Sequence, residues 1–377
     1  MRKRDHPILG STILRLALGV SLASQGAAPG AEVRELNVTI REWDVPTKGA
    51  HPHDPAVGPD GALWFTEQMA NKLGRLDLAT GTFKEYSLVE GKNSGPHGLV
   101  ADQEGNIWYT ANFGGYIGKL DPRTGKVTEY KMPDESVDDP HTAVFDARGI
   151  LWFTAQGGNA VGRLDPRTGK IELKKVPTES ALPYGIQINS KRVPFFCELG
   201  TNKMGKIDPA TMGITEYKLP VGARPRRLAI AADDKIYFTD FKGGNLGRLD
   251  PTTGAVKMWV SPGGHDSGPY GIAITPDGMV WYSESEVKPN TIIQFDPKTD
   301  KFARATIPSG GGVVRNMAAT ADGRVYIACS AVDKVGVVER VHWGPFPAAR
   351  PSCRGACDER NSRKTQRTTL SGSFARG

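Results

Sequence analysis

The feature that most constrains this chain is an internal repeat. An aromatic run, Leu63–Thr66, returns in similar form at Ile107–Thr110, Leu151–Thr154, Pro194–Cys197, Ile236–Thr239, Val280–Ser283 and Val325–Ala328. A second motif, Gly-Arg/Lys-Leu/Ile-Asp, ends at Asp77, Asp121, Asp165, Asp208 and Asp250, with a looser copy ending at Asp296. The spacings of this motif, 44, 44, 43, 42 and 46 residues, fall in the range of propeller blades.

Each copy of the repeat has the pattern of four short β-strands. In the first copy, aromatic and β-branched runs predict strands at Pro52–Val57, Leu63–Thr66, Lys72–Leu76 and Phe83–Tyr86. Turn residues separate the strands, as in the Asp-Pro-x-Thr-Gly turns that end at Gly125 and Gly169. No sustained apolar stripe of helical period follows residue 31, so we expect helices to contribute little.

The number of copies predicts how the ring closes. The seventh copy supplies only three strands, Val314–Ala319, Val325–Ala328 and Val335–Arg340. The missing strand has a match in Val38–Pro46, near the other end of the chain. Pairing that segment with the last blade would leave few exposed strand edges. We therefore predict an all-β fold, a seven-bladed β-propeller of four-stranded antiparallel blades over residues 36–341, with an N-terminal strand closing the last blade.

The two ends of the chain differ from the repeats. Residues 1–31 combine a basic start with a largely apolar stretch, which resembles a secretory signal and predicts a secreted or periplasmic protein. Residues 342–377 are basic, carry no repeat and have few large apolar side chains, which predicts a disordered tail. The net charge of +7 belongs to these ends, because residues 32–341 sum to −1. The sequence thus gives no support for a nucleic-acid partner or a membrane span.

One position in each copy opens the first strand and another closes the second. Counting outward from the first turn predicts that the two are antiparallel neighbours, as for His53 and Glu67. The first strands of all blades line the central tunnel in parallel, so these residues should gather at one mouth. The inner set is His53, His97, His141, Tyr184, Arg226, Tyr270 and Arg315, with acids behind it at Glu67, Glu198, Asp240 and Glu284.

Two constellations within this set compete as the reactive centre. In the first, His51 and His53 share a strand face and Glu67 faces them, which is a two-histidine, one-carboxylate site for a divalent metal. The second joins His97, the run Asp139-Pro140-His141 and Tyr184 from successive blades. The structural alternatives are a wet tunnel whose polar residues pair with one another, and a turn-forming role for Asp139.

The repeated pattern Pro-His/Tyr-Gly-Ile…Asp-Gly-x-Leu-Trp-Phe-Thr-Glu…Asn-Lys-Leu-Gly-Arg-Leu resembles the streptogramin B lyase (virginiamycin B lyase) family over essentially the whole body. The resemblance implies a seven-bladed propeller that opens the ester bond of a cyclic depsipeptide by elimination, with Mg²⁺. It implies that Asp139-Pro140-His141 is the family's acidic-Pro-His motif. His97 matches its preceding-blade histidine, and Tyr184 matches its following-blade tyrosine. Ala155 stands where the family has a second metal-binding glutamate.

Roles follow from this resemblance. It implies that His141 is the base, that His97 and Tyr184 orient the substrate, and that Asp139 is a metal ligand. Glu67 or Glu198, from neighbouring blades, would supply the missing carboxylate. The metal candidates are Asp139, Glu67, His51 and His53, and the substrate-binding candidates are Tyr270, Arg226, Glu198, Glu284 and Arg315.

Three functions remain open at this point. The first is a metal-assisted carbon–oxygen lyase, using a divalent metal such as Mg²⁺ on a small cyclic ester or peptide-like substrate. The second is a lactonase or esterase that uses a metal-bound water held by His51, His53 and Glu67. The third is a non-catalytic propeller that binds a ligand or protein, because one fold hosts many functions. We expect a monomer in each case.

Overall fold

The structure is a computed structural model that describes residues 33–91 and 93–341. The chain divides into two compact units, Met1–Arg340 and Val341–Gly377, and nearly all described residues belong to the first. The predicted leader at 1–31 and the predicted tail at 342–377 lie outside the described residues.

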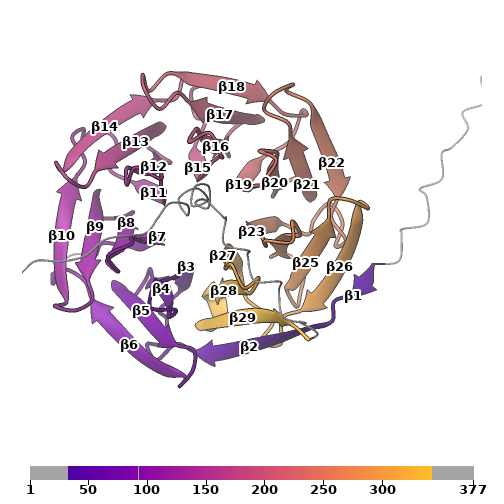
Figure 1. Ribbon diagram of the computed structural model, residues 1–377, viewed down its shortest axis with the longest axis horizontal. Helices are drawn as coiled ribbons and strands as arrows, with labels where there is room; N and C mark the ends of the chain where they lie inside the picture. The colour runs from indigo at the N-terminus through magenta and orange to yellow at the C-terminus, as the bar shows by residue number, and fades with distance from the viewer. Residues whose placement is uncertain (1–32, 92, 342–377) are drawn as a thin grey trace, which may run out of the picture. The chain divides into compact units, whose positions relative to one another are not determined.

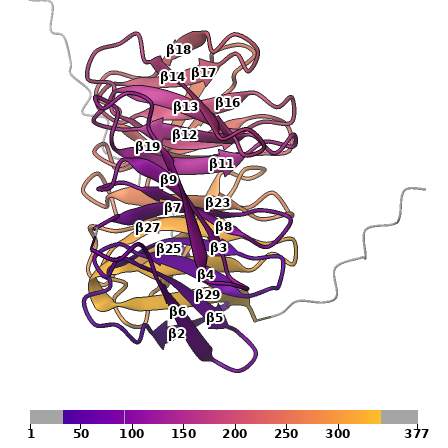
Figure 2. The ribbon, with the colours of Figure 1, turned by 90° about the vertical axis from the view of Figure 1, so that its left-hand side faces the viewer.

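Seven antiparallel sheets stand in chain order around a central tunnel (Figure 1), which confirms the predicted propeller. Seen from the side, their strands run between the two faces of the ring (Figure 2). The strands of the first three blades are β3 (Pro52–Val57), β4 (Leu63–Glu67), β5 (Lys72–Asp77), β6 (Thr82–Ser87), β7 (Pro96–Ala101), β8 (Ile107–Ala111), β9 (Tyr116–Asp121), β10 (Lys126–Lys131), β11 (Pro140–Phe145), β12 (Leu151–Ala155), β13 (Ala160–Asp165) and β14 (Lys170–Lys175).

The next three blades repeat the same order, with the first strand of each nearest the tunnel. Their strands are β15 (Pro183–Ile188), β16 (Pro194–Glu198), β17 (Lys203–Ile207), β18 (Ile214–Lys218), β19 (Pro225–Ile230), β20 (Ile236–Asp240), β21 (Asn245–Leu249), β22 (Val256–Val260), β23 (Pro269–Ile274), β24 (Val280–Glu284), β25 (Thr291–Asp296) and β26 (Lys301–Thr306).

The last blade joins the two ends of the repeat region. It contains β27 (Val314–Ala319), β28 (Val325–Cys329) and β29 (Lys334–Arg340) from the seventh copy. The N-terminal strand β2 (Val38–Asp44) pairs antiparallel with β29, which confirms the predicted closure. The sequence did not predict β1 (Arg34–Glu35), which pairs parallel with β26 and makes the sixth sheet five-stranded.

Helical structure is almost absent from the part of the chain that the structure describes. It is limited there to the 3₁₀ turn η1 (Ser330–Val332). None of these residues belongs to a helix with the length and apolar character needed to cross a membrane.

The hydrophobic core consists of separate clusters, most of them lying between neighbouring blades. One of them joins Trp64 and Leu73 of the first blade to Leu99 and Tyr109 of the second. The glycine of the repeated Gly-Arg/Lys-Leu motif belongs to this packing. A Cβ on Gly74 would stand 2.1 Å from the ring of Phe65 in the adjacent strand, so any larger residue would displace that ring. The first five blades therefore need glycine opposite the second-strand aromatic ring, whereas Ile293 faces Tyr282 in the sixth.

Candidate active site at one mouth of the tunnel

The inner strand of every blade bulges after its first residue. In the first blade Pro52 faces Glu67 and Pro55 faces Phe65, so that His53 and Asp54 together oppose Thr66. The predicted pairing of His53 with Glu67 was therefore wrong by one residue, because the bulge inserts an extra residue into the inner strand. The same correction applies to the other six blades, where the true partners of the closing residues are Pro96, Pro140, Pro183, Pro225, Pro269 and Val314.

A threonine in the second strand holds each of the first three bulges. In the second blade, Thr110 Oγ1 accepts the backbone N–H of Gly98 at 2.7 Å and donates to the backbone oxygen of His141 at 2.6 Å. Thr66 makes the corresponding contacts with Asp54 N at 3.0 Å and with His97 O at 3.1 Å. These hydroxyls tie the bulge of one blade to the inner strand of the next. They therefore fix the backbone that carries the histidines.

The structure brings the predicted inner residues together at one mouth. The rings of His53, His97 and His141 follow one another with centroids 3.8 Å apart. Tyr184 continues this stack at 4.0 Å from His141, and its hydroxyl group shares a short hydrogen bond with that of Tyr270. We call the three imidazoles with Tyr184 the histidine stack. All four side chains are buried.

Two arginines complete the mouth. The guanidinium carbon of Arg226 lies 3.7 Å from the ring centroid of Tyr270, and that of Arg315 lies 5.9 Å from the same centroid. Cations placed over aromatic faces in this way are attracted by the ring quadrupole. Arg226 Nε is buried without a hydrogen-bond partner among the described residues. The mouth thus combines imidazoles, phenols and positive charge.

Hydrogen bonds set the tautomers of two histidines. Nδ1 of His97 lies 3.1 Å from the backbone oxygen of His141, and Nδ1 of His53 lies 2.8 Å from the carboxylate of Asp54. Both partners only accept, so each Nδ1 carries the hydrogen and each neutral ring keeps a free electron pair on Nε2. His141 Nδ1 contacts the hydroxyl oxygen of Thr142 at 3.0 Å.

The imidazoles are neutral at neutral pH. Burial lowers the pKa of His53, His97 and His141 well below the usual value of 6.5. The positive charge of Arg227 lowers the pKa of all three further. Neutral imidazoles can accept a proton, but the burial and positive charge that keep these rings neutral also make them weaker bases than a free histidine.

A polar bridge, not foreseen from the sequence, crosses the tunnel just beyond the histidine stack. Arg227 donates to Asp54 at 2.9 Å and to Thr142 at 3.3 Å, and Asn316 donates to Asp54 at 2.9 Å. Asp54 and Arg227 are 1% and 3% exposed, so this is a fully buried ion pair. We call these four residues the tunnel bridge. The sequence signal for this bridge was a charged residue directly after the inner-strand histidine or arginine, as in His53-Asp54 and Arg226-Arg227.

Two of the predicted acids are occupied by internal hydrogen bonds. The carboxylate of Asp139 accepts the backbone N–H groups of Gly157 and Gly158, as expected for a turn-stabilising residue. Glu284 accepts from Ser261 Oγ at 2.5 Å, from Gly263 N at 2.6 Å and from Thr291 Oγ1 at 2.7 Å. Both side chains stabilise the loops around them.

Two more of the predicted acids, Glu67 and Glu198, are buried with oxygens that lack a hydrogen-bond partner, while the fifth, Asp240, accepts from Arg224 N at 2.8 Å. Neither carboxylate oxygen of Glu67 has a hydrogen-bond partner in the described chain, and Glu198 lacks one on Oε1. Burial, assisted by the nearby Glu85 carboxylate, raises the pKa of Glu67 to about 8. Burial, assisted by Glu216, raises the pKa of Glu198 to about 7.

The metal ligands predicted from sequence are not brought together. Across residues 33–91 and 93–341, the one group of three His, Cys, Asp or Glu side chains with ligand atoms within 4.8 Å of one another is His53, Asp54 and His97. His53 alone belongs to the predicted set. The ring of His51 lies 6.4 Å from that of His53, in a residue with a left-handed φ of 55° just before β3.

The residues present do not fit a magnesium ion. Mg²⁺ prefers oxygen ligands, whereas two of the three residues in this group offer nitrogen. The remaining ligand, Asp54, is already bound to the guanidinium of Arg227, whose charge opposes a cation there. In the third blade, Ala155 offers no carboxylate and Asp139 is bound to the loop.

The chain is a closed seven-bladed propeller. Imidazole and phenol side chains from several of its blades meet at one mouth of the tunnel, and this arrangement defines the class of protein. Residues 33–197 and 183–344 match the family model described as the Virginiamycin B lyase family, and the chain belongs to that family. The family expected from the repeated motif is thereby confirmed.

Solved structures share this fold. A streptogramin B lyase is 26% identical, with a TM-score of 0.73 over 80% of this chain and 98% of that one. A catalytically inactive histidine-to-alanine variant of virginiamycin B lyase from Staphylococcus aureus, solved with quinupristin, is 23% identical, with a TM-score of 0.73 over 80% and 99%. The hydrazine synthase of Kuenenia stuttgartiensis, 15% identical with a TM-score of 0.66 over 84% and 99%, shares the fold alone.

Proposed function

We propose that the chain is a carbon–oxygen lyase that opens a small cyclic ester by elimination at the histidine mouth. Family membership supports the reaction class, and quinupristin, the compound solved with the Staphylococcus aureus relative, suggests the kind of substrate. The observation that carries the proposal is the stack of neutral imidazoles, in which hydrogen bonding of Nδ1 leaves Nε2 free to take a proton.

Elimination of an ester needs a base beside a carbon–hydrogen bond that is next to a carbonyl group. The base removes that proton, the electron pair forms a carbon–carbon double bond, and the carbon–oxygen bond breaks as a carboxylate leaves. We assign the base to His141, the residue that matches the family's motif. When its Nδ1 donates to Thr142, 3.0 Å away, Nε2 is left to accept the proton.

Negative charge grows on the substrate carbonyl and on the leaving carboxylate during this step. Arg226 and Arg315 stand over Tyr270 beside the stack, and Arg226 has an unmatched buried donor. We assign the stabilisation of this charge to the two guanidinium groups. Because the residues present do not fit magnesium, no step is assigned to a metal. Tyr184 lies at the end of the stack, where its hydroxyl group shares a hydrogen bond with that of Tyr270.

The test is incubation of the EDTA-treated protein with quinupristin, followed by mass spectrometry. Elimination opens the ring without changing its mass, whereas hydrolysis adds the mass of one water. We expect a ring-opened product of unchanged mass and turnover that survives EDTA. Changing His141→Ala should lower turnover about 100- to 10,000-fold, the usual contribution of a positioned base.

The matched control is His265→Ala, because His265 is an exposed histidine whose Nδ1 contacts Gly243 O. That variant should keep full turnover. A product heavier by one water would replace the lyase with a hydrolase. Recovery of intact quinupristin would exclude this compound as a substrate. Binding of quinupristin without any turnover would favour a non-catalytic propeller. Loss of turnover in EDTA with recovery in Mg²⁺ would contradict the assignment to the arginines.

A further inference from the structure

The tunnel holds a second compartment on the other side of the tunnel bridge. A cavity of about 460 Å³ is lined by the inner strands of all seven blades. Its lining begins with Asp54, Thr142, Arg227 and Asn316 and continues along the strands away from the histidine stack. The bridge therefore separates this cavity from the mouth that carries the proposed active site. The volume lies within the usual range for small-molecule pockets.

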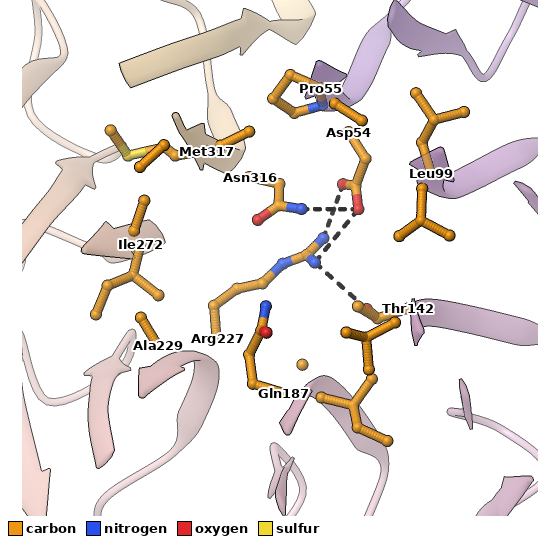
Figure 3. Close-up of a pocket in the computed structure, with 18 of the residues that line it drawn as sticks. Asp54, Pro55, Leu99, Thr142, Gln187, Arg227, Ala229, Ile272, Asn316 and Met317 are labelled. Carbon is orange, nitrogen blue, oxygen red and sulfur yellow. Dashed lines mark hydrogen bonds and ion pairs between the residues drawn. The ribbon is translucent and has the colours of Figure 1, made fainter. Parts of the chain in front are cut away.

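The lining of this cavity has the composition of a ligand pocket. Most of the residues in its walls are apolar, Leu99, Ile186, Ile272 and Met317 among them, although polar atoms make up more of the exposed surface than apolar atoms. Figure 3 shows Leu99, Ile272 and Met317 around a polar floor, where Arg227 contacts Asp54 and Thr142 and Asn316 contacts Asp54. Apolar walls with a few placed polar groups are typical of sites that bind small molecules.

The charged residues of the floor, Asp54 and Arg227, favour an uncharged ligand. Asp54 and Arg227 are the only charged residues among those that line the cavity, and they pair with each other at 2.9 Å. An ionic ligand would therefore enter the cavity without a free counter-charge, which is unfavourable. A neutral ligand has no such cost.

Two amides and one unmatched donor indicate what a neutral ligand should carry. Gln187 is exposed and lies beside Arg227 in the cavity, and the amide oxygen of Asn316 turns away from Asp54 (Figure 3). Arg227 Nε is buried without a hydrogen-bond partner among the described residues. An amide or ester group can accept from these donors, and an amide can also donate to the free oxygens.

We propose that this cavity binds an uncharged small molecule with an apolar body and an amide or ester group, and that the tunnel bridge links its occupant to the histidine stack. The link is direct. Asp54 contacts His53 Nδ1 at 2.8 Å, Thr142 contacts His141 Nδ1 at 3.0 Å, and Arg227 contacts both bridge residues. A ligand that accepts a hydrogen bond from Arg227 changes the hydrogen bonds that orient the imidazoles of His53 and His141. The proposal does not depend on which reaction the histidine stack carries out.

The test is a calorimetric titration of the full chain with two matched probes, N-acetylleucinamide and N-acetylleucine. They share an apolar body but differ in carrying an amide or a carboxylate. We expect the amide to bind at least tenfold more tightly. Gln187→Leu should weaken its binding at least tenfold, and Gln103→Leu, a change at an exposed glutamine in a surface turn, should leave it unchanged.

Nuclear magnetic resonance of the imidazole nitrogens tests the link. The amide probe should shift the signals of His53 and His141 and leave those of the exposed His265 in place. The proposed site would be overturned if the two probes bound with equal affinity or if neither bound. It would also be overturned if Gln187→Leu left the affinity for the amide unchanged. Binding without a shift of the His53 and His141 signals would overturn the link.

Discussion

Glu67 and Glu284 close the second strands of their blades but differ in their hydrogen bonds. Glu284 receives three donors from surrounding loops and strands, whereas neither oxygen of Glu67 has a partner among the described residues. A buried carboxylate without donors is costly, so the protonated form is favoured. This is why the pKa of Glu67 is raised to about 8.

The first prediction concerns this carboxyl group. Below about pH 4.5, its ordinary pKa, Glu67 keeps its proton in both the folded and the unfolded chain. Between pH 4.5 and 8 the unfolded chain has lost the proton and the folded chain retains it, so the free energy of unfolding falls as the pH rises. Glu67→Gln removes this loss, which amounts to about 1.4 kcal/mol per pH unit. Urea denaturation from pH 5 to 8 measures it.

A second carboxyl group provides the internal reference. The pKa of Glu198 is raised to about 7, so Glu198 contributes to the pH dependence below that value and little above it. The interval from pH 7 to 8 therefore reports mainly on Glu67. If Glu67→Gln has the same slope as the unchanged protein in that interval, the carboxyl is already ionised in the fold.

At the scale of single elements, the bulge in each inner strand positions the candidate site. It lets two consecutive residues, such as His53 and Asp54, stand opposite the single Thr66. The first of them joins the histidine stack and the second joins the tunnel bridge. A regular strand would have sent the second side chain to the opposite face of the sheet. The bulge thus connects the two compartments of the tunnel.

The second-strand threonines hold these bulges, and Thr110 provides their test. Thr110→Val keeps the shape of the side chain but leaves the buried Gly98 N without this acceptor and removes one donor to His141 O. The expected loss of stability is about 1–3 kcal/mol, because buried polar groups lose partners. Thermal or urea denaturation measures it.

The controls separate the hydroxyl group from the methyl group. Thr110→Ser keeps the hydroxyl and should recover most of the stability. Thr128→Val changes an exposed threonine of β10 and should alter the stability by less than about 0.5 kcal/mol. A Thr110→Val variant as stable as the Thr128→Val variant would mean that the bulge does not depend on this hydroxyl.

The repeat predicted the strands and the blade order because each copy carries aromatic runs and turn residues at fixed positions. In the first copy, the predicted Lys72–Leu76 and the observed Lys72–Asp77 differ by one residue. The bulge was not predictable by counting residues, since counting assumes a regular ladder. Asp54 and Arg227 were missed for that reason, because adjacent strand residues are expected on opposite faces. Nor does a two-residue strand such as β1 have a pattern to detect.

At the scale of the whole ring, the N-terminal segment and the last blade depend on each other. All seven residues of β2 pair with β29, from Val38 opposite Arg340 to Asp44 opposite Lys334. Asp333 then joins the last blade to the first, because its carboxylate accepts Gly49 N at 2.7 Å and His51 N at 3.1 Å. Closure of the ring therefore also fixes the backbone that leads into β3 and His53.

The final prediction tests this closure with a chain that begins at Pro46 and lacks β2. Its strand β29 would present an unpaired edge, which promotes association with other chains and removes part of the interblade packing. We expect a lower melting temperature and concentration-dependent aggregation. A synthetic peptide of residues 33–45 should bind that edge as an added strand and restore the melting temperature. The same peptide with Ile40→Pro should fail, because proline removes a ladder N–H at the pair with Val338. A truncated chain that melts at the original temperature without the peptide would show that six complete blades and three strands hold the ring by themselves.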